Sequence, residues 1–364
     1  MDPTWGIWLF SIVMYVMMGI VFMLVPLIST RVLLFGVFVP EPMRDDEAVT
    51  AVRKSYIRMS VFIMVCAAAA GGLVGWWMKG MSEAVLLSAT LVQVIGFVLS
   101  LAASHRRALR IKLEKGWEPP QSTKRVANLN FRKGPLTIRD RWYLVHLLLI
   151  IISVIGAAVQ WDSIPDTLTT HYNASFEADG FSEKSFSSVF MMNITQLLLI
   201  GIFLFTNFVI RAAKQQLDPA KPDESMIKQQ KFRRINSIFL YFLSLFIVAL
   251  FSYIQATILY GWSAELLMLT SLFLPLILIG CSIGLIIYLR SKGIDQVLAA
   301  GVSDDSHWKG GFFYHNPEDP SFIVNKRYGM GWTFNMAHPV SWVVLGGILL
   351  ILLVIVLITS ILDT

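Results

Sequence analysis

The chain has 364 residues, of which 55% are hydrophobic and only 15% charged, and its mean hydropathy is +0.64. Soluble domains contain about 45–50% apolar and about 25% charged residues, so this composition excludes an ordinary soluble domain. The formal net charge of +6 reflects loop orientation and contact with anionic lipid more than any affinity for nucleic acid.

Apolar residues are concentrated in blocks of about 20 residues, the length that a helix needs to cross a hydrocarbon core. Backbone groups in lipid must bond internally, which leaves helices or closed barrels, and barrel strands would alternate polar and apolar residues. These blocks do not alternate, so the sequence predicts an all-α polytopic membrane protein with about eight transmembrane helices. The blocks cover residues 5–28, 60–78, 84–103, 142–161, 189–210, 236–262, 266–289 and 340–361.

Lysine and arginine lie almost entirely in alternate connections between these blocks. Of the 30 cations, 28 fall within residues 31–58, 106–141, 211–234 and 290–327, whereas the remaining connections hold only Lys79 and Lys184. Cytoplasmic loops retain Lys and Arg. We therefore expect a multi-pass protein of the cell membrane (inner or plasma) with cytoplasmic basic loops, and with both termini and residues 162–186 outside.

The predicted spans divide the chain into five regions without a soluble domain. Residues 1–161 form a four-span region with a basic cytoplasmic loop at 104–141, and residues 162–186 form an extracytoplasmic polar loop. Residues 187–290 hold spans five to seven, residues 291–339 a cytoplasmic segment rich in aromatic residues and glycine, and residues 340–364 the last span. The basic stretch 105–117 is either an extension of the third span or a solvated loop.

Glycines repeat at four-residue spacing within two spans, at Gly71 and Gly75 and again at Gly280 and Gly284. This spacing places both glycines on one helix face and predicts close helix packing. Acidic and basic side chains are absent from the middle of the predicted spans, which argues against an ion-coupled pump. We expect the polar residues buried there to bond neighbouring helices; they are Gln93, His146, Asn193, Gln196, Asn207 and Gln255.

Two cytoplasmic segments have the composition of extended chain. In residues 33–42, glycine, β-branched residues and prolines favour a strand or turn. In residues 307–342, the stretches 312–316 and 321–328 flank a Pro-Glu-Asp-Pro sequence that predicts a β-hairpin turn. We expect the two segments to pair or to seal the cytoplasmic end of the bundle, with aromatic rings at the membrane interface. Those rings are Trp308, Phe312, Phe313, Tyr314, Tyr328 and Trp332.

The polar loop 162–186 holds five acidic residues against one lysine, and an anionic patch of this kind attracts cationic peptides or divalent metals. The candidate ligand-binding residues are His171, Asn173, Glu177, Asp179, Glu183 and Lys184. Of these, His171, Glu177 and Asp179 offer metal-ligand chemistry, although their spacing matches neither a calcium loop nor a zinc motif. The alternative is a capped turn, in which Ser187 or Ser188 caps the following helix.

The loop sequence IPDTLTTHYNASFEADGFSEKS resembles the extracytoplasmic loop of the SdpI-type immunity family of bacterial multispanning membrane proteins. The matching positions are Pro165, His171, Asn173, Asp179, Gly180 and Lys184, whereas Phe176 stands where that family often has glycine. The first inside segment, FGVFVPEP, also resembles that family, and YHNPEDPSFIVNKRYGMGWTFN resembles an uncharacterised module appended to such proteins. The resemblance implies immunity against a secreted peptide toxin, or sensing of one.

These observations favour a non-enzymatic membrane receptor or immunity-like protein that recognises a cationic peptide, without a cofactor. A cytoplasmic or membrane protein partner would then receive the signal. One alternative is a transporter or flippase, which the span count permits. The other is a membrane-embedded metal-dependent hydrolase that uses His171, although the outer face offers that histidine alone.

Overall fold

The computed structural model describes residues 4–28, 33–78, 82–117, 127–172, 178–215, 217–219, 221–294, 305–327 and 331–362. The chain divides into two compact units, each made from several stretches of sequence. The first unit combines Met1–Asn128, Lys214–Gln229 and Leu276–Ser341. The second combines Leu129–Ala213, Gln230–Pro275 and Trp342–Thr364.

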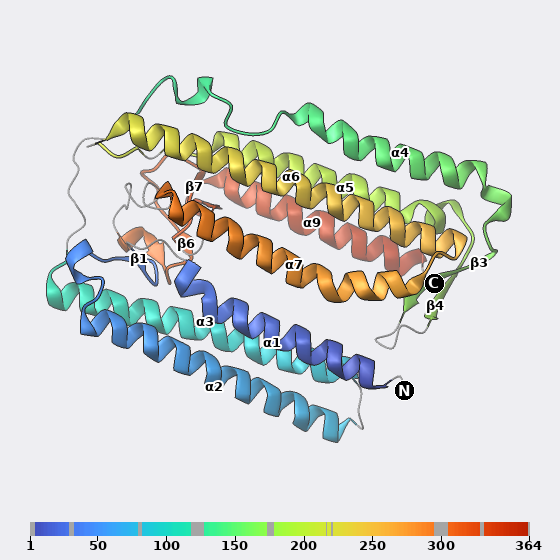
Figure 1. The fold of residues 1–364 in the computed structure, drawn as a ribbon, viewed down its shortest axis with the longest axis horizontal. Helices are drawn as coiled ribbons and strands as arrows, with labels where there is room; N and C mark the ends of the chain where they lie inside the picture. Colours follow the sequence, from blue (N-terminus) through green and yellow to red (C-terminus); the bar gives the residue numbers. More distant parts are fainter. Residues whose placement is uncertain are drawn as a thin grey trace. The chain divides into compact units, whose positions relative to one another are not determined.

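Every predicted apolar block forms a helix in the described part of the chain (Figure 1). Six helices, α2 to α7, are long and apolar enough to cross a membrane, which confirms the all-α polytopic fold. Among the residues searched, the apolar stretches of α1 and α9 are shorter, Ile12–Leu24 and Pro339–Leu350, so eight spans remain a prediction. The helices are α1 (Thr4–Ile28), α2 (Glu47–Trp77), α3 (Ser82–Lys115), α4 (Leu144–Val159), α5 (Phe186–Ala212), α6 (Pro222–Tyr260), α7 (Ala264–Ser291) and α9 (Pro339–Leu362).

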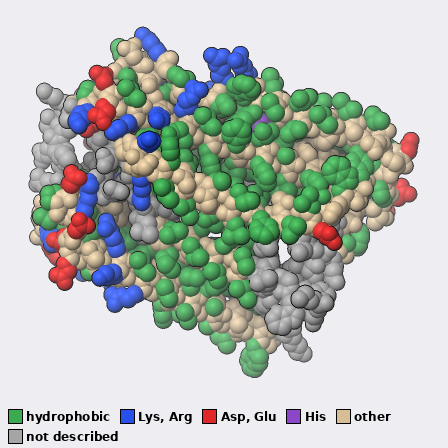
Figure 2. Space-filling model, in the orientation of Figure 1, with side chains coloured by type: hydrophobic (Ala, Val, Ile, Leu, Met, Phe, Trp, Pro, Cys, Tyr) green, Lys and Arg blue, Asp and Glu red, His purple; other side chains and the backbone are tan. Residues whose placement is uncertain are grey.

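The helix surfaces are covered largely by hydrophobic side chains, with Lys and Arg gathered near helix ends (Figure 2). Helix α3 continues as far as Lys115, so of the two alternatives for the basic stretch 105–117 the structure shows the extension of the third span. Its cations therefore project from a regular helix rather than from a solvated loop.

Helices α2 and α3 lie side by side in the first unit, and small residues set their separation. A Cβ built at Gly71 would lie 3.2 Å from Cβ of Ala89, and one at Gly75 would lie 2.9 Å from a methyl group of Val85. The predicted close approach is thus confirmed for α2. At Gly280 and Gly284 in α7, no atom of the described residues comes within 4 Å of such a Cβ, so the prediction is not met there.

A short hairpin follows α1 and confirms the predicted extended segment. Strands β1 (Leu33–Leu34) and β2 (Val37–Phe38) pair antiparallel around Phe35 and Gly36, whose φ angles are 48° and 80°. Positive φ at both central residues is the geometry that suits a two-residue hairpin. His105 Nδ1 donates to the carbonyl oxygen of Phe35 at 2.7 Å, which helps to hold this turn.

The predicted hairpin around residues 317–320 is wrong. Instead β5 (Trp308–Lys309) pairs with β6 (Phe313–Tyr314), and β7 (Ile323–Asn325) pairs with β8 (Trp332–Phe334). Gly310 and Gly311, with φ of 61° and 79°, provide the first of these turns. The prolines at 317 and 320 instead lie in the irregular connection between β6 and β7.

The predicted interfacial position is also wrong for Trp308 and Tyr314, which are buried together with Val324 in a small core. Phe313 is 58% exposed, Phe312 packs partly against the core beneath β1 and β2, and Tyr328 lies outside the described residues. The extended segments at residues 33–42 and 307–342 form separate two-stranded sheets and do not pair with each other.

In the second unit, α4, α5 and α6 share a row of polar contacts within a largely apolar bundle. Asn193 and Gln255 exchange two hydrogen bonds, from Nδ2 to Oε1 at 3.1 Å and from Nε2 to Oδ1 at 2.7 Å. Gln196 donates to Ser252, and His146 contacts Ser244, both at 2.8 Å. The prediction that buried polar residues bond neighbouring helices is confirmed, including for Asn207 with Ser237 and for Gln93 with the Tyr15 carbonyl.

The two glycine pairs provide a matched test of helix packing. We expect Gly71→Leu to destabilise the purified full-length protein by about 1–3 kcal/mol, because its side chain would overlap Ala89 and the Val85 carbonyl. Gly280→Leu should leave the thermal midpoint in detergent nearly unchanged. Equal effects of the two substitutions would contradict the packing described for α2 and α3.

Candidate functional site

The predicted polar loop between α4 and α5 is a regular β-hairpin in the described residues. Strands β3 (Thr167–Tyr172) and β4 (Ala178–Glu183) pair antiparallel, with Thr167 opposite Glu183 and Leu168 opposite Ser182. A register shift on either side of His171 interrupts the pairing, and the backbone of His171 lies opposite Gly180. The described residues of the predicted polar loop thus form a two-stranded β-hairpin.

The end of the hairpin is capped as the alternative interpretation required, although by a different serine. Ser185 is the N-cap residue of α5, and its hydroxyl accepts the backbone N–H of Ser188 at 3.1 Å. The hydroxyl of Ser188 in turn accepts the backbone N–H of Ser185 at 2.9 Å. This reciprocal pair satisfies backbone donors that a helix leaves free at its first turn.

The base of the hairpin is anchored by Lys184. Its backbone N–H donates to the Asp166 carbonyl at 2.8 Å, and its Nζ donates to the Ile164 carbonyl at 3.0 Å. The same Nζ lies 5.3 Å from the centre of the Trp161 ring, within the range of a cation–π contact. Lys184 therefore holds the chain on both sides of the hairpin together at its base through three separate contacts.

Apolar side chains fix the inner face of the hairpin to the helix ends. Leu168 and Ile164 are buried in one core with Ala157, Val189 and Leu259. Because side chains alternate along a strand, the neighbours of Leu168 and Ser182 point to the opposite face. That outer face carries Phe181, which is 60% exposed, and the exposed carboxylate of Glu183.

Exposed acidic and aromatic side chains occur on the hairpin and in the residues next to its ends. Asp162, Asp166 and Glu183 are exposed, and none forms an ion pair with any other residue that the structure describes. Asp179 is also exposed on β4. Phe186, 75% exposed, stacks on Trp161 with ring centres 4.8 Å apart. The carboxylates of Asp162, Asp166 and Glu183, without an ion pair in the described residues, and the exposed rings of Phe181 and Phe186 therefore face solvent.

The sequence-predicted site residues fall into three groups. Asp179, Glu183 and Lys184 belong to the hairpin described above. The side chain of His171 and the whole of Asn173 and Glu177 lie outside the described residues. Within the residues that were searched, no three His, Cys, Asp or Glu side chains gather as a metal site would require. A metal at His171, Glu177 and Asp179 therefore remains a prediction.

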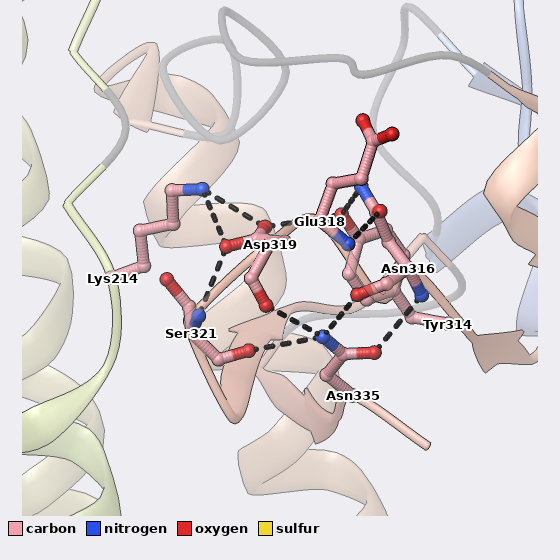
Figure 3. A network of polar contacts seen from close by, with 7 residues as sticks. All are labelled: Lys214, Tyr314, Asn316, Glu318, Asp319, Ser321 and Asn335. Carbon is pink, nitrogen blue, oxygen red and sulfur yellow. Dashed lines mark hydrogen bonds and ion pairs between the residues drawn. The ribbon is translucent and has the colours of Figure 1, made fainter. Parts of the chain in front are cut away.

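A second polar cluster, in the first unit, was not predicted from the sequence. Asn335 is fully buried, and its Nδ2 donates to the carbonyl oxygens of Asn316, Asp319 and Ser321 at 2.9–3.3 Å (Figure 3). Its Oδ1 accepts the backbone N–H groups of Asn316 and Ala337 at 3.0 and 3.1 Å. One amide therefore organises the irregular chain between β6 and β7 and connects it to the residues before α9.

Asp319 is the charged member of this cluster. Lys214 Nζ donates to its two oxygens at 3.1 and 2.9 Å, and the Ser321 N–H donates to Oδ1 at 3.0 Å (Figure 3). Burial by itself would raise the pKa of the Asp319 carboxyl, but these bonds outweigh it and hold the pKa below its usual value. The carboxylate is thus a structural acceptor, already satisfied by its own chain.

The first unit also contains a buried group of ion pairs centred on Asp305. The Asp305 carboxylate bonds Arg327, and it accepts Lys112 Nζ at 2.6 Å. Arg327 also donates to the Gly36 carbonyl at 2.6 Å, so it bridges the β1–β2 turn and the segment before β5. The sequence signal for the cluster around Asn335 is the stretch of Asn, Asp and Pro at residues 316–320, which by itself predicts only a hairpin turn.

Two protein-family models match parts of the chain. One is described as a domain of unknown function (DUF1648) and covers residues 148–197, which include the β3–β4 hairpin with parts of α4 and α5. The other is described as a family of unknown function (DUF5808) and covers residues 317–342, which include Asp319 and Asn335. No curated protein and no solved structure matches the chain.

Asn335 provides a nearly isosteric test of the buried cluster. We expect Asn335→Asp to lower the thermal midpoint of the full-length protein, because a carboxylate would face three carbonyl oxygens without a donor, at a cost of about 1–3 kcal/mol or more. Asn130→Asp, at an exposed turn position, is the matched control. A midpoint equal to that of the control would contradict the role assigned to Asn335.

The lowered pKa of Asp319 predicts how the stability of the folded protein depends on pH. Its pKa is lower in the folded state than the unfolded value of about 3.9, so its stabilising contribution is complete above that value and is lost as pH falls through the folded pKa. Asp319→Asn should therefore reduce stability at pH 7 and flatten the acid limb of a denaturation series from pH 7 to pH 3. Asp223→Asn, at an exposed residue of α6, removes the same charge and is the matched control.

Proposed function

We propose that this integral membrane protein recognises a cationic peptide outside the cell through the outer face of the β3–β4 hairpin. The recognition residues are Phe181 and the carboxylates of Asp179 and Glu183, with Asp162 and Asp166 at the hairpin base. The proposal places the chain with SdpI-type immunity proteins and makes it a receptor or protector rather than an enzyme.

The observation that carries the proposal is the arrangement of carboxylates and an exposed aromatic ring on the β3–β4 hairpin, which Lys184 holds at its base. Phe181 and Glu183 lie two residues apart on one strand and share the face opposite buried Leu168. Carboxylates attract Lys and Arg over a distance, and an exposed ring offers both apolar area and a cation–π surface. Because strands β3 and β4 are already paired in the structure without a peptide, less conformational entropy is lost when a peptide binds.

The distribution of cations supports an outward position for the hairpin. The connection between α4 and α5 holds only Lys184, whereas the connections on either side of it hold 11 and 7 of the chain's Lys and Arg residues. The positive-inside rule assigns the connection that is poor in Lys and Arg to the outer face of the membrane. The DUF1648 match centres on the same hairpin, and the loop sequence resembles that of immunity proteins.

The other candidate functions have less support. A hydrolase would use His171 with Glu177 or Asp179, and no bond of the described residues favours it. The buried amides of α5 and α6 bond each other, which favours a packing role over a transport path. We therefore retain peptide recognition as the proposed function.

The test uses the full-length protein in nanodiscs of zwitterionic lipid, with a fluorescent amphipathic peptide of lysine and leucine as the probe. We expect Asp179→Asn with Glu183→Gln to weaken binding about fivefold to tenfold, because each removed charge contributes up to about 1 kcal/mol at a surface. Phe181→Ser should weaken binding further, and without the strong salt dependence of the charge variants.

Glu265→Gln is the matched control. Glu265 is an exposed acid in the first turn of α7, on the face that the cation pattern also assigns to the exterior. Binding that falls equally in this control and in the hairpin variants would mean that overall charge, and not the hairpin, attracts the peptide. Unaltered binding in all variants would remove the hairpin from the mechanism.

A further inference from the structure

Helices α2 and α3 form an antiparallel pair with three points of contact along their length. Arg107 Nη1 donates to Ser55 Oγ at 2.6 Å. Farther along, a Cβ at Gly96 would lie 2.6 Å from Ile63, and a Cβ at Gly71 would lie 3.2 Å from Ala89. Residue numbers rise along α2, whereas the numbers of the contacting residues on α3 fall. The basic ends of both helices therefore lie together, near Ser55 and Arg107.

Unpaired cations surround this Arg107–Ser55 contact. Arg58 is one turn from Ser55 on α2, and Arg110 is one turn from Arg107 on α3, so each shares a face with the contacting residue. All three arginines are exposed, and none forms an ion pair with any residue in the described ranges.

The nearest acid on the two helices is Glu114, one turn beyond Arg110 on α3, and it forms no ion pair with Arg110 in the part of the chain that the structure describes. Helix α2 has no acidic residue after Glu47, and α3 has none between Ala84 and Leu113. Among the neighbouring cations, Lys115 is paired with Asp46 at 2.5 Å and Lys112 with Asp305 at 2.6 Å. Arg53, Lys54 and Arg106 form no ion pair within the described ranges and add to the positive charge there. The positive charge of Arg58, Arg107 and Arg110 is therefore left for a ligand from outside the chain.

The surface next to these arginines, toward the middle of the spans, is exposed and apolar. Phe62 on α2, one turn beyond Arg58, is 63% exposed, and Leu99 on α3, two turns before Arg107, is 62% exposed. Both belong to helices that qualify as membrane spans. A ligand that fits must therefore combine an anionic head with a hydrocarbon tail.

We propose that the exposed surface of α2 and α3 around the Arg107–Ser55 contact is a binding site for one anionic phospholipid. The headgroup phosphate accepts hydrogen bonds from Arg58, Arg107 and Arg110, and an acyl chain lies over Phe62 and Leu99. The guanidinium fork matches phosphate in a two-bond geometry, which a lysine ammonium does not reproduce. The bond from Arg107 to Ser55 restrains the Arg107 side chain before the lipid binds.

The test measures lipid retention by native mass spectrometry on the full-length protein, titrated with phosphatidylglycerol or with phosphatidylcholine. We expect one phosphatidylglycerol to be retained in preference to phosphatidylcholine, and Arg58→Gln with Arg107→Gln to weaken it about 30-fold. Arg58→Lys with Arg107→Lys should retain only part of the affinity, because a lysine keeps the positive charge but cannot form two parallel hydrogen bonds with the phosphate. Soluble glycerol phosphate should not compete, since it lacks the acyl chains.

The control pair is Lys231→Gln with Arg234→Gln, which removes the same charge from exposed positions of α6. Thermal midpoints of both pairs are compared with that of the unaltered protein, so that unfolding is not mistaken for lost binding. An equal loss in both pairs would reduce the site to general electrostatic attraction and overturn the proposal. Equal retention of the two lipids, or displacement by glycerol phosphate, would overturn it as well.

Discussion

The hydrocarbon interior of a membrane offers no hydrogen-bond partner, and this constraint explains most of the arrangement of the chain. Backbone groups are satisfied within helices, and the polar side chains of the spans find partners on adjacent helices. The reciprocal bonds between Asn193 and Gln255 are the clearest instance, because each amide is both donor and acceptor to the other. Non-helical backbone occurs in the connections, where turns, caps and buried ion groups satisfy it.

The same constraint decided what the sequence could predict. Long apolar blocks left helix as the only solution, so the helices and the polar residues that join them were predicted, whereas the basic stretch at the end of α3 was left open between helix and loop. Glycine spacing was informative only where a partner helix comes close, at Gly71 and Gly75. At Gly280 and Gly284 no described residue packs against the glycines, since four-residue spacing identifies a shared face but does not determine what packs against it.

The connections were harder to predict, since short strands depend on contacts distant in sequence. The pairing of β6 was assigned to the wrong partner because Pro317 and Pro320 suggested a turn, while Gly310 and Gly311 provided the stronger one. Asn335 was missed because one amide reaches three carbonyl groups that lie at least fourteen positions earlier in the chain. The hairpin of β3 and β4 was predicted as a polar segment, but its anchor at Lys184 required the positions of Trp161 and Ile164.

The account therefore depends on which side of the membrane the β3–β4 hairpin faces. Impermeant maleimide labelling of intact cells tests this directly, in a background where Cys66 and Cys281, the chain's two cysteines, are replaced by serine. Glu183→Cys should react from outside the cell, whereas Arg132→Cys in the basic connection should react only after the membrane is permeabilised. Labelling of Arg132→Cys but not of Glu183→Cys in intact cells would place the hairpin in the cytoplasm and contradict recognition of an external peptide.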